Sequence, residues 1–160
     1  MIREVVLSDC KSIMDIYNYY IEKTIISFEE SPLTVTEMET RVNEIDERFP
    51  YLVYEEEGHI LGYAYVNTFQ SRSAYRFTLE NSIYVRNGYQ GKGIGKALLN
   101  ELINEVRKLE IHSIIAKIAL PNAISIKLHE TFYFKNAGIL KEAGRKFDKW
   151  IDVGYWELIL

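Results

Sequence analysis

The chain has 160 residues, of which 48% are hydrophobic, and this is enough for one well-buried core but short for two ordinary domains. We therefore predict a single domain over residues 1–160. The 19 basic and 23 acidic residues give a net charge of −4, which argues against a general nucleic-acid surface or attraction to anionic membranes. Cys10 is the only cysteine, so an intrachain disulfide and a cysteine-based zinc site are excluded, as fits a reducing cytoplasm.

The first residues, 1–9, include acidic side chains and lack the long apolar core of a secretion signal. No later apolar run approaches the roughly 18 residues that a membrane span needs. We therefore expect a cytoplasmic protein without a membrane, nucleic-acid or metal partner, and with a small molecule as its ligand.

The first half of the sequence predicts short strands and two amphipathic helices. A strand is expected over residues 2–7, and Ser8 or Asp9 can cap a helix with an apolar stripe behind it. Thr34-x-x-Glu37 is a capping box that begins a second helix, which Pro50 ends. Three further strands are expected, over residues 51–54, 60–69 and 75–85. Together these elements predict an antiparallel meander next to two helices.

The second half predicts a crossover and a mixed sheet. Apolar residues recur at helical spacing between Ala97 and Leu109, and the β-branched run 113–118 follows as a strand. Pro121-Asn122 opens another helix that reaches His129. The last predicted elements are strands over residues 134–140 and 155–160, with a polar and aromatic loop over 144–150. This order predicts an α/β fold, with a central twisted sheet, partly antiparallel and partly parallel, and helices on both faces.

The most informative segment is 85–99, because a strand, a glycine-rich turn and a helix start follow one another there without a gap. Glycine can adopt left-handed conformations that direct successive backbone N–H groups at one point. The helix that begins near Lys96 adds the positive end of its dipole and its unpaired N–H groups. The segment therefore predicts a binding site for a phosphorylated ligand.

Spacing separates this loop from two better-known phosphate loops. A P-loop is excluded because the position five residues before Gly95 is not glycine and Ala97 stands where a magnesium-binding hydroxyl belongs. A dinucleotide fingerprint is excluded because the glycines follow Gly-x-Gly-x-Gly, so Lys96 stands where the third glycine belongs. The run Gln90-Gly-Lys-Gly-Ile-Gly95 is instead similar to the Gln/Arg-x-x-Gly-x-Gly/Ala pyrophosphate loop of the GCN5-related N-acetyltransferases (GNAT).

One carboxylate before the loop is a candidate general base. Strand alternation directs Glu80 to the same side as Ser82 and Tyr84, where we expect a polar cleft. A carboxylate there can take the proton that an amine must lose to become nucleophilic. The alternative is an exposed charge on a sheet face. Asn81 interrupts the apolar side of this strand and predicts a β-bulge.

A histidine and two arginines complete the candidates for chemistry. His129 lies on the helix after Asn122, and histidine suits proton transfer near neutral pH, but a packed, hydrogen-bonded ring is the commoner role. Arg72 and Arg76 could hold a carboxylate or phosphinate through paired N–H donors, although ordinary solvated arginines remain the alternative.

Taken in order, these motifs make nearly the whole chain similar to one GNAT branch, the phosphinothricin and methionine sulfone/sulfoximine N-acetyltransferases. The segments that carry the resemblance are Arg72-Ser-Ala-Tyr75, Thr78-Leu-Glu80-Asn-Ser-Ile-Tyr84-Val85, the loop 90–96, Leu120-Pro121-Asn122 through Leu128-His129-Glu130, and residues 143–156. The resemblance implies the GNAT fold, acetyl-CoA as co-substrate and a homodimer.

The resemblance also implies roles for individual residues. Glu80 falls at the position of the base, and His129 at that of the residue that protonates the leaving thiolate. The cofactor would contact Ile83, Tyr84, Val85, Gln90, Gly91, Lys92, Gly93, Ile94, Gly95, Lys96 and Asn122. The acceptor would contact Arg72, Ser73, Ala74, Tyr75 and Tyr84. Two departures are Phe132-Tyr-Phe134 in place of Leu-Gly-Phe, and Gln70 where a relative has lysine.

The expected function is acetyl transfer from acetyl-CoA to the α-amine of a small, amino-acid-like compound, with Glu80 as general base and His129 as acid or orienting residue. A nearby alternative keeps the chemistry but acetylates a protein N-terminus or a lysine. An alternative of another class is an acyl-CoA-binding sensor without turnover.

Overall fold

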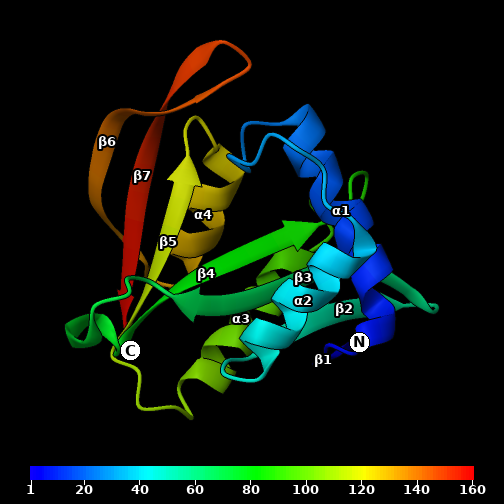
Figure 1. The fold of residues 1–160 in the computed structure, drawn as a ribbon. Coiled ribbons are helices and arrows are strands. Elements are labelled where there is room, and N and C mark those ends of the chain that lie inside the picture. The colour runs from blue at the N-terminus through cyan, green and yellow to red at the C-terminus, as the bar shows by residue number, and fades with distance from the viewer.

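A seven-stranded sheet forms the centre of the molecule, and the computed structural model describes all of residues 1–160 (Figure 1). The spatial order of the strands is β1-β2-β3-β4-β5-β7-β6. Their bounds are β1 Ile2–Glu4, β2 Tyr51–Glu56, β3 His59–Thr68, β4 Thr78–Val85, β5 Ser113–Ala119, β6 Lys135–Lys146 and β7 Lys149–Ile159. Only β4 and β5 pair in parallel. The predicted mixed sheet is therefore confirmed.

Helices cover both faces of this sheet, as predicted (Figure 1). Helices α1 (Cys10–Lys23) and α2 (Val35–Asp46) lie on one face and share a core with the central residues of β2 and β3, including Val53 and Tyr63. Helices α3 (Ile94–Val106) and α4 (Ala123–Thr131) lie on the other face, where Leu98, Leu102 and Val106 are fully buried. The capping box is present at Thr34, whose hydroxyl accepts from the Glu37 N–H. None of these helices is long and apolar enough to span a membrane.

Gly62 of β3 brings α3 close to the sheet. A Cβ at this position would lie 3.0 Å from the Tyr84 carbonyl oxygen and 3.1 Å from Ile94 Cγ2. A larger residue would push α3 away, because these neighbours belong to the strand and the helix that flank the glycine-rich loop. Gly62 thus fixes where the start of α3 lies relative to the end of β4.

Several predicted boundaries are wrong, and the largest error concerns residues 144–150. These residues are not a loop, since β6 continues to Lys146 and β7 begins at Lys149. The turn between them consists of Phe147 and Asp148, with φ of 51° and 57°. Both central residues of such a tight hairpin turn need positive φ, for which Asn-Gly is the usual signal, so Phe-Asp gave no indication of it.

The predicted bulge at Asn81 is also wrong. The register between β3 and β4 runs without a shift from Gly62↔Val85 to Thr68↔Leu79. Asn81 interrupts the apolar pattern for another reason, because its amide is buried and bonds to a side chain of α4. At the ends of the other elements, β1 stops at Glu4, and residues Ser73–Tyr75 form a 3-10 turn before β4.

The two parallel strands diverge, and this creates the candidate site. β4 and β5 pair only from Thr78↔Ser113 to Glu80↔Ile115. Beyond Glu80, β4 continues beside β3 while β5 continues beside β7, so the two strands separate like the arms of a V (Figure 1). The backbone of β4 after Glu80 consequently has one edge without a strand partner.

Candidate active site

A cavity of about 1250 Å³ lies where β4 and β5 separate. The residues that line it come from α1 and the segment after it, β4, the glycine-rich loop, β5, α4, β6 and β7. The sequence-predicted residues that the fold brings to this cavity are Glu80, Ile83, Tyr84, Val85, Gln90, Gly91, Gly93, Gly95, Lys96, Asn122 and His129.

The glycine-rich loop presents an open backbone to the cavity. Gly91 and Gly93 have φ of 76° and 84°, which side chains rarely adopt, and a Cβ on either would have no neighbour within 4 Å. Gly93 is the N-cap of α3, and the helix makes its first backbone bond from the Ala97 N–H to the Gly93 carbonyl, at 2.9 Å. The N–H groups of the first turn before Ala97 have no helical carbonyl to bond, so the loop suits a pyrophosphate.

Side chains in and next to this loop hold its conformation through local contacts. The Gln90 Oε1 atom accepts from the Gly88 N–H at 2.8 Å, and Ile94, the first residue of α3, is buried in the core. Lys92 lies outside the cavity lining, with its ammonium 4.5 Å from the centre of the Tyr89 ring. The Asn122 Oδ1 atom caps α4 by accepting from the Ser125 N–H at 3.1 Å, which places this side chain at the cavity wall.

Glu80 forms an ion pair inside the cavity. Its Oε2 atom lies 2.7 Å from the Lys117 Nζ atom, and the Glu80 and Lys117 side chains are 24% and 39% exposed. Glu80 thus faces a cavity together with Ser82 and Tyr84, the side that strand alternation predicts. The sequence analysis missed Lys117. Only the parallel register of β4 and β5, with Glu80 opposite Ile115, could have placed Lys117 next to Glu80.

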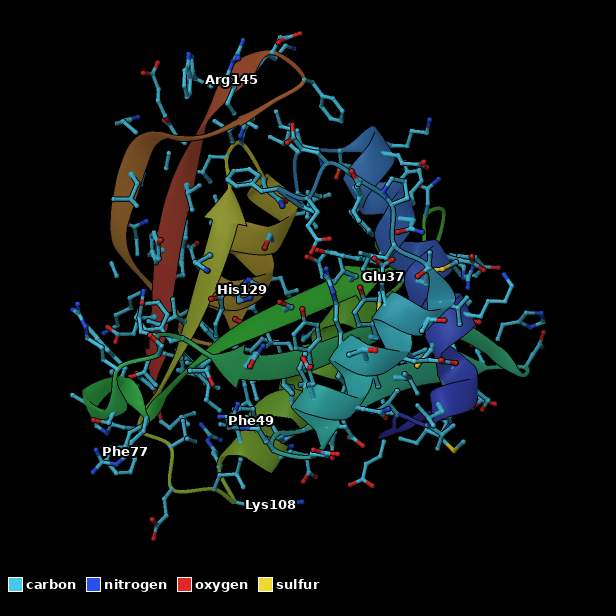
Figure 2. The ribbon with its side chains drawn as sticks, in the orientation of Figure 1. Glu37, Phe49, Phe77, Lys108, His129 and Arg145 are labelled. Atoms are coloured by element: carbon cyan, nitrogen blue, oxygen red, sulfur yellow. The ribbon has the colours of Figure 1, made fainter.

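Asn81 of β4 and His129 of α4 form a buried pair. Figure 2 labels His129 on α4, close to β4 and β5. The His129 Nδ1 atom lies 2.8 Å from the Ser125 carbonyl oxygen, which can only accept, so Nδ1 carries the proton. Nε2 then accepts from the Asn81 amide at 2.9 Å. Burial lowers the pKa of His129, so this neutral form is favoured. The Asn81 Oδ1 atom is buried and has no hydrogen-bond partner.

Tyr84 belongs to an aromatic cluster. Its ring meets the edges of Tyr17 and Tyr20, with centroids 5.1 and 5.2 Å away, and stacks on Tyr63 at 5.3 Å. Burial raises the pKa of Tyr84 well above its usual value, so the hydroxyl stays protonated. The Tyr20 hydroxyl donates to the Val85 carbonyl at 2.6 Å and so ties α1 to the end of β4.

The comparisons with known proteins agree with this geometry. The family model "Acetyltransferase (GNAT) domain" matches residues 2–154. The chain is 35% identical to phosphinothricin N-acetyltransferase of Streptomyces viridochromogenes, over 98% of this chain and 85% of the relative. It is 34% identical to the L-methionine sulfoximine/L-methionine sulfone acetyltransferase of Salmonella typhimurium, over 96% of this chain and 90% of the relative.

The chain belongs to the GNAT acetyltransferase family.

Solved structures support the same assignment. A phosphinothricin acetyltransferase from Sinorhizobium meliloti in complex with acetyl-CoA superposes with a TM-score of 0.96 and 37% identity, over 100% of this chain and 88% of that chain. A ribosomal-protein-alanine N-acetyltransferase from Brucella melitensis gives a TM-score of 0.98 and 35% identity, over 100% and 99%. The protein is an acetyl-CoA-dependent N-acetyltransferase with the GNAT fold, in the phosphinothricin and methionine sulfoximine branch, so these predictions are confirmed.

The acetyltransferase does not bring Arg72, Ser73, Ala74 and Tyr75 to the cavity within one chain. These residues lie in and beside the exposed 3-10 turn before β4, and none of them lines the cavity. Tyr75 instead meets the edge of Phe69, with ring centroids 5.9 Å apart. Arg76 lies over its neighbour Phe77, with the guanidinium carbon 4.2 Å from the ring centre. Their predicted contact with the acceptor stays a prediction.

A clamp between two distant segments borders the cavity, and two of its residues, Ser27 and Phe28, line it. The clamp consists of Ser27 and Phe28, after α1, and Gly144 and Lys146 of β6. The Lys146 Nζ atom donates to the Ser27 carbonyl at 2.6 Å, and Lys146 is only 3% exposed. A Cβ on Gly144 would lie 2.3 Å from the Phe28 ring, so only glycine allows this close contact. The sequence analysis missed the clamp.

Glu29 stands beside the clamp but is already engaged. Its carboxylate pairs with the Arg41 guanidinium at 2.5 Å and accepts from the Tyr17 hydroxyl at 3.2 Å. The Ser27 hydroxyl in turn donates to the Tyr17 oxygen at 3.0 Å. Glu80 is therefore the cavity carboxylate whose only ion-pair partner is a flexible lysine.

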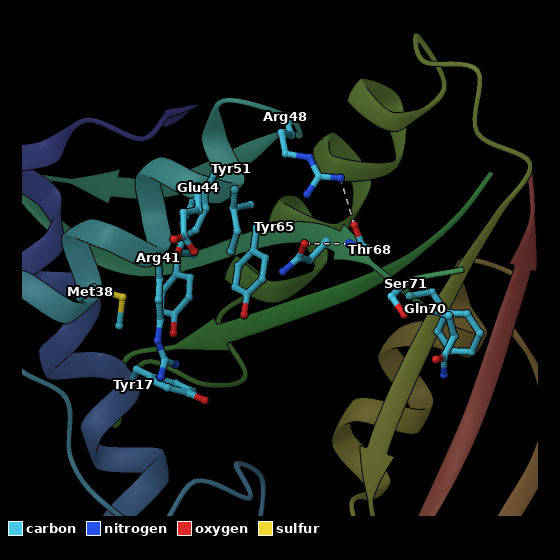
Figure 3. A pocket seen from close by; sticks show the side chains of 14 residues that line it. Tyr17, Met38, Arg41, Glu44, Arg48, Tyr51, Tyr65, Thr68, Gln70 and Ser71 are labelled. Carbon is cyan, nitrogen blue, oxygen red and sulfur yellow. Dashed lines mark hydrogen bonds between the residues drawn. The ribbon is translucent and has the colours of Figure 1, made fainter. Parts of the chain in front are cut away.

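A second hollow, of about 830 Å³, lies between α2 and β3 (Figure 3). Arg41, Glu44 and Tyr65 project into it, and Arg48 reaches the Thr68 hydroxyl at 3.3 Å. Tyr17 lines both this groove and the cavity. The groove adjoins the cavity along the sheet, since Tyr65 and Asn67 of β3 pair with Ser82 and Glu80 of β4.

Proposed function

We propose that the enzyme acetylates the α-amine of a small amino-acid-like acceptor of the phosphinothricin, methionine sulfone or methionine sulfoximine type. The observation that carries this proposal is Glu80, a carboxylate that faces the cavity and already holds a primary ammonium at 2.7 Å. The clamp holds Ser27 and Phe28 at the wall of the same cavity, which has the size of a small-molecule site. The names of the relatives supply the acceptor class.

In the proposed mechanism Glu80 is the general base. The acceptor enters as an ammonium and gives a proton to Glu80, directly or through one water. The amine nitrogen then attacks the thioester carbonyl carbon of acetyl-CoA, and the C–S bond breaks. CoA leaves as the thiolate and becomes the thiol by taking the second proton that the new amide nitrogen loses. Backbone N–H groups on the unpaired edge of β4 after Glu80 would polarise the thioester oxygen.

We assign the donor to the other half of the cavity. The pyrophosphate would bind at residues 90–96, the pantetheine arm along Ile83, Tyr84 and Val85, and Asn122 would contact it from α4. The open backbone of the loop and the unpaired edge of β4 support this placement. We assign His129 the role of orienting Asn81, because its one proton is bonded to the Ser125 carbonyl and burial disfavours a second.

We also propose a homodimer in the cytoplasm. β6 is an edge strand of the sheet, and Ile139, Leu140 and Trp150 on the β6–β7 hairpin are about half exposed or more. Long exposed edges with apolar side chains favour association. Cys10 is a free, buried thiol, as suits a reducing compartment. Light scattering that gives a mass of 18.7 kDa, that of one chain, would reject the dimer.

A peptide amine is the second candidate acceptor. The groove beside Tyr17 offers room for a chain that extends away from Glu80, and the Brucella melitensis structure carries the name of a ribosomal-protein-alanine N-acetyltransferase. A peptide N-terminus would place its amine at Glu80 and its following residues in the groove.

Release of free thiol from acetyl-CoA tests both candidates. The acceptors are phosphinothricin, methionine sulfone and methionine sulfoximine, beside a panel of peptides with different first residues and a reaction without acceptor. Saturable release with the small acceptors supports the proposal. Release with peptides alone moves the function to protein acetylation, and no acceptor-dependent release contradicts both.

A further inference from the structure

Lys117 is placed on β5 so that it reaches back to Glu80. The parallel pairing ends at Glu80↔Ile115, and Lys117 follows two residues later, on the same face of the sheet as Ile115. The strands already diverge there, so a short side chain would not cross the gap. The Lys117 stem does cross it and leaves Nζ 2.7 Å from the Glu80 Oε2 atom.

The Lys117 ammonium has the chemistry of an unreacted acceptor. Both are primary ammonium groups with a positive charge and three N–H donors. Glu80 is the only ion-pair partner of Lys117, and the other carboxylate nearby, Glu29, is held by Arg41. Lys117 therefore occupies the position beside Glu80 that an acceptor amine needs.

We propose that Lys117 is a resident cation, which fills the ammonium position at Glu80 until an acceptor displaces it. The inference rests on the proposed function in one respect, that the acceptor amine binds at Glu80. Lys117 is then a positioning residue that sets acceptor affinity, since only the fraction of enzyme with Glu80 released can bind an acceptor. An uncharged compound would be unable to replace the Lys117 ammonium at Glu80, so this ion pair favours cationic amines over uncharged competitors.

The ion pair is suited to this exchange. The Lys117 side chain is 39% exposed, so its ammonium can turn into water without becoming a buried, unpaired charge. Ion pairs with this much exposure are weak, so an incoming ammonium can replace them at little cost. Lys146 makes a contrast, because it is buried at the clamp and has no such freedom.

Substitution of Lys117 tests the inference. Lys117→Met removes the resident cation, so the acceptor KM should fall about two- to fivefold, while kcat and the acetyl-CoA KM stay within twofold. Lys117→Arg keeps the positive charge, and its planar guanidinium can donate two hydrogen bonds to the Glu80 carboxylate. The acceptor KM should therefore rise above that of the wild type. Lys23→Met, at an exposed lysine of α1 without an ion pair, is the matched control and should change neither constant.

A merely structural role for Lys117 predicts a different result. If Lys117 only held Glu80 in place, Lys117→Met would lower kcat and leave the acceptor KM unchanged or raised, and this outcome overturns the inference. Calorimetric titration of methionine sulfone into each protein without acetyl-CoA should give the same order. The Kd should be lowest for Lys117→Met, intermediate for the wild type and highest for Lys117→Arg. Because this measurement needs no turnover, it separates failure of the inference from failure of the proposed function.

Discussion

The donor half of the cavity is formed mainly by backbone, and the acceptor half mainly by side chains. The donor half consists mainly of backbone from one continuous segment, from Ile83 to Lys96, with glycines at positive φ. The acceptor half consists of side chains from segments far apart in the chain, such as Tyr17, Phe28, Lys117 and Leu140. Donor binding should therefore depend on backbone conformation and acceptor binding on side-chain identity, so the two can change independently.

Glu80→Gln should give the largest effect and the clearest separation of the two halves. Loss of a general base typically lowers kcat about 10²- to 10⁴-fold, while the acetyl-CoA KM should stay within about twofold because the donor half is untouched. Steady-state kinetics with varied acetyl-CoA measures both. Glu110→Gln, an exposed carboxylate after α3, is the control. A kcat within about threefold of the wild type would remove Glu80 from the mechanism.

Gly93 tests the backbone nature of the donor half. Gly93→Val forces a β-branched residue into the left-handed region at φ 84°, at a cost of roughly 1–2 kcal/mol, and should raise the acetyl-CoA KM about tenfold. Gly93→Asn should have a smaller effect, since asparagine tolerates this conformation and a Cβ there has open space. Acceptor KM should be unchanged in both, and thermal unfolding monitors the fold. Equal donor KM in all three proteins would contradict a conformational role.

His129, which lies between the two halves, should give the smallest effect. Because burial lowers the pKa of His129 below its ordinary 6.5, the unfolded chain binds a proton more readily than the folded protein. Its contribution to stability is complete above pH 6.5 and is lost as the pH falls below that value. The melting temperature should thus drop more between pH 7.5 and 5.5 in the wild type than in His129→Gln.

The same variant also distinguishes an orienting residue from an acid. Glutamine can still accept from Asn81 and donate to the Ser125 carbonyl, so His129→Gln should lower kcat less than tenfold and keep the shape of the pH–rate profile. Disappearance of the alkaline limb in His129→Gln would show that His129 donates a proton to the leaving thiolate.

The difference between the halves also explains what the sequence could predict. The glycine-rich loop was predictable because its residues are contiguous and their spacing is itself the signal. Glu80 was predictable because strand alternation is local. Lys117 was not, because its contact depends on the register of β4 and β5, and the turn at Phe147 and Asp148 lacks the residues that usually mark a hairpin. The predicted acceptor residues at 72–75 lie outside the cavity of one chain.

The clamp of Lys146 on Ser27 joins residues that are 119 positions apart. During synthesis, the segment that forms the donor half leaves the ribosome well before β6 and β7 do. The acceptor half is incomplete until β6 docks on the segment after α1. The nascent chain thus contains the residues of the donor half before those of the acceptor half, and acceptor selectivity can be complete only after the last two strands have been made.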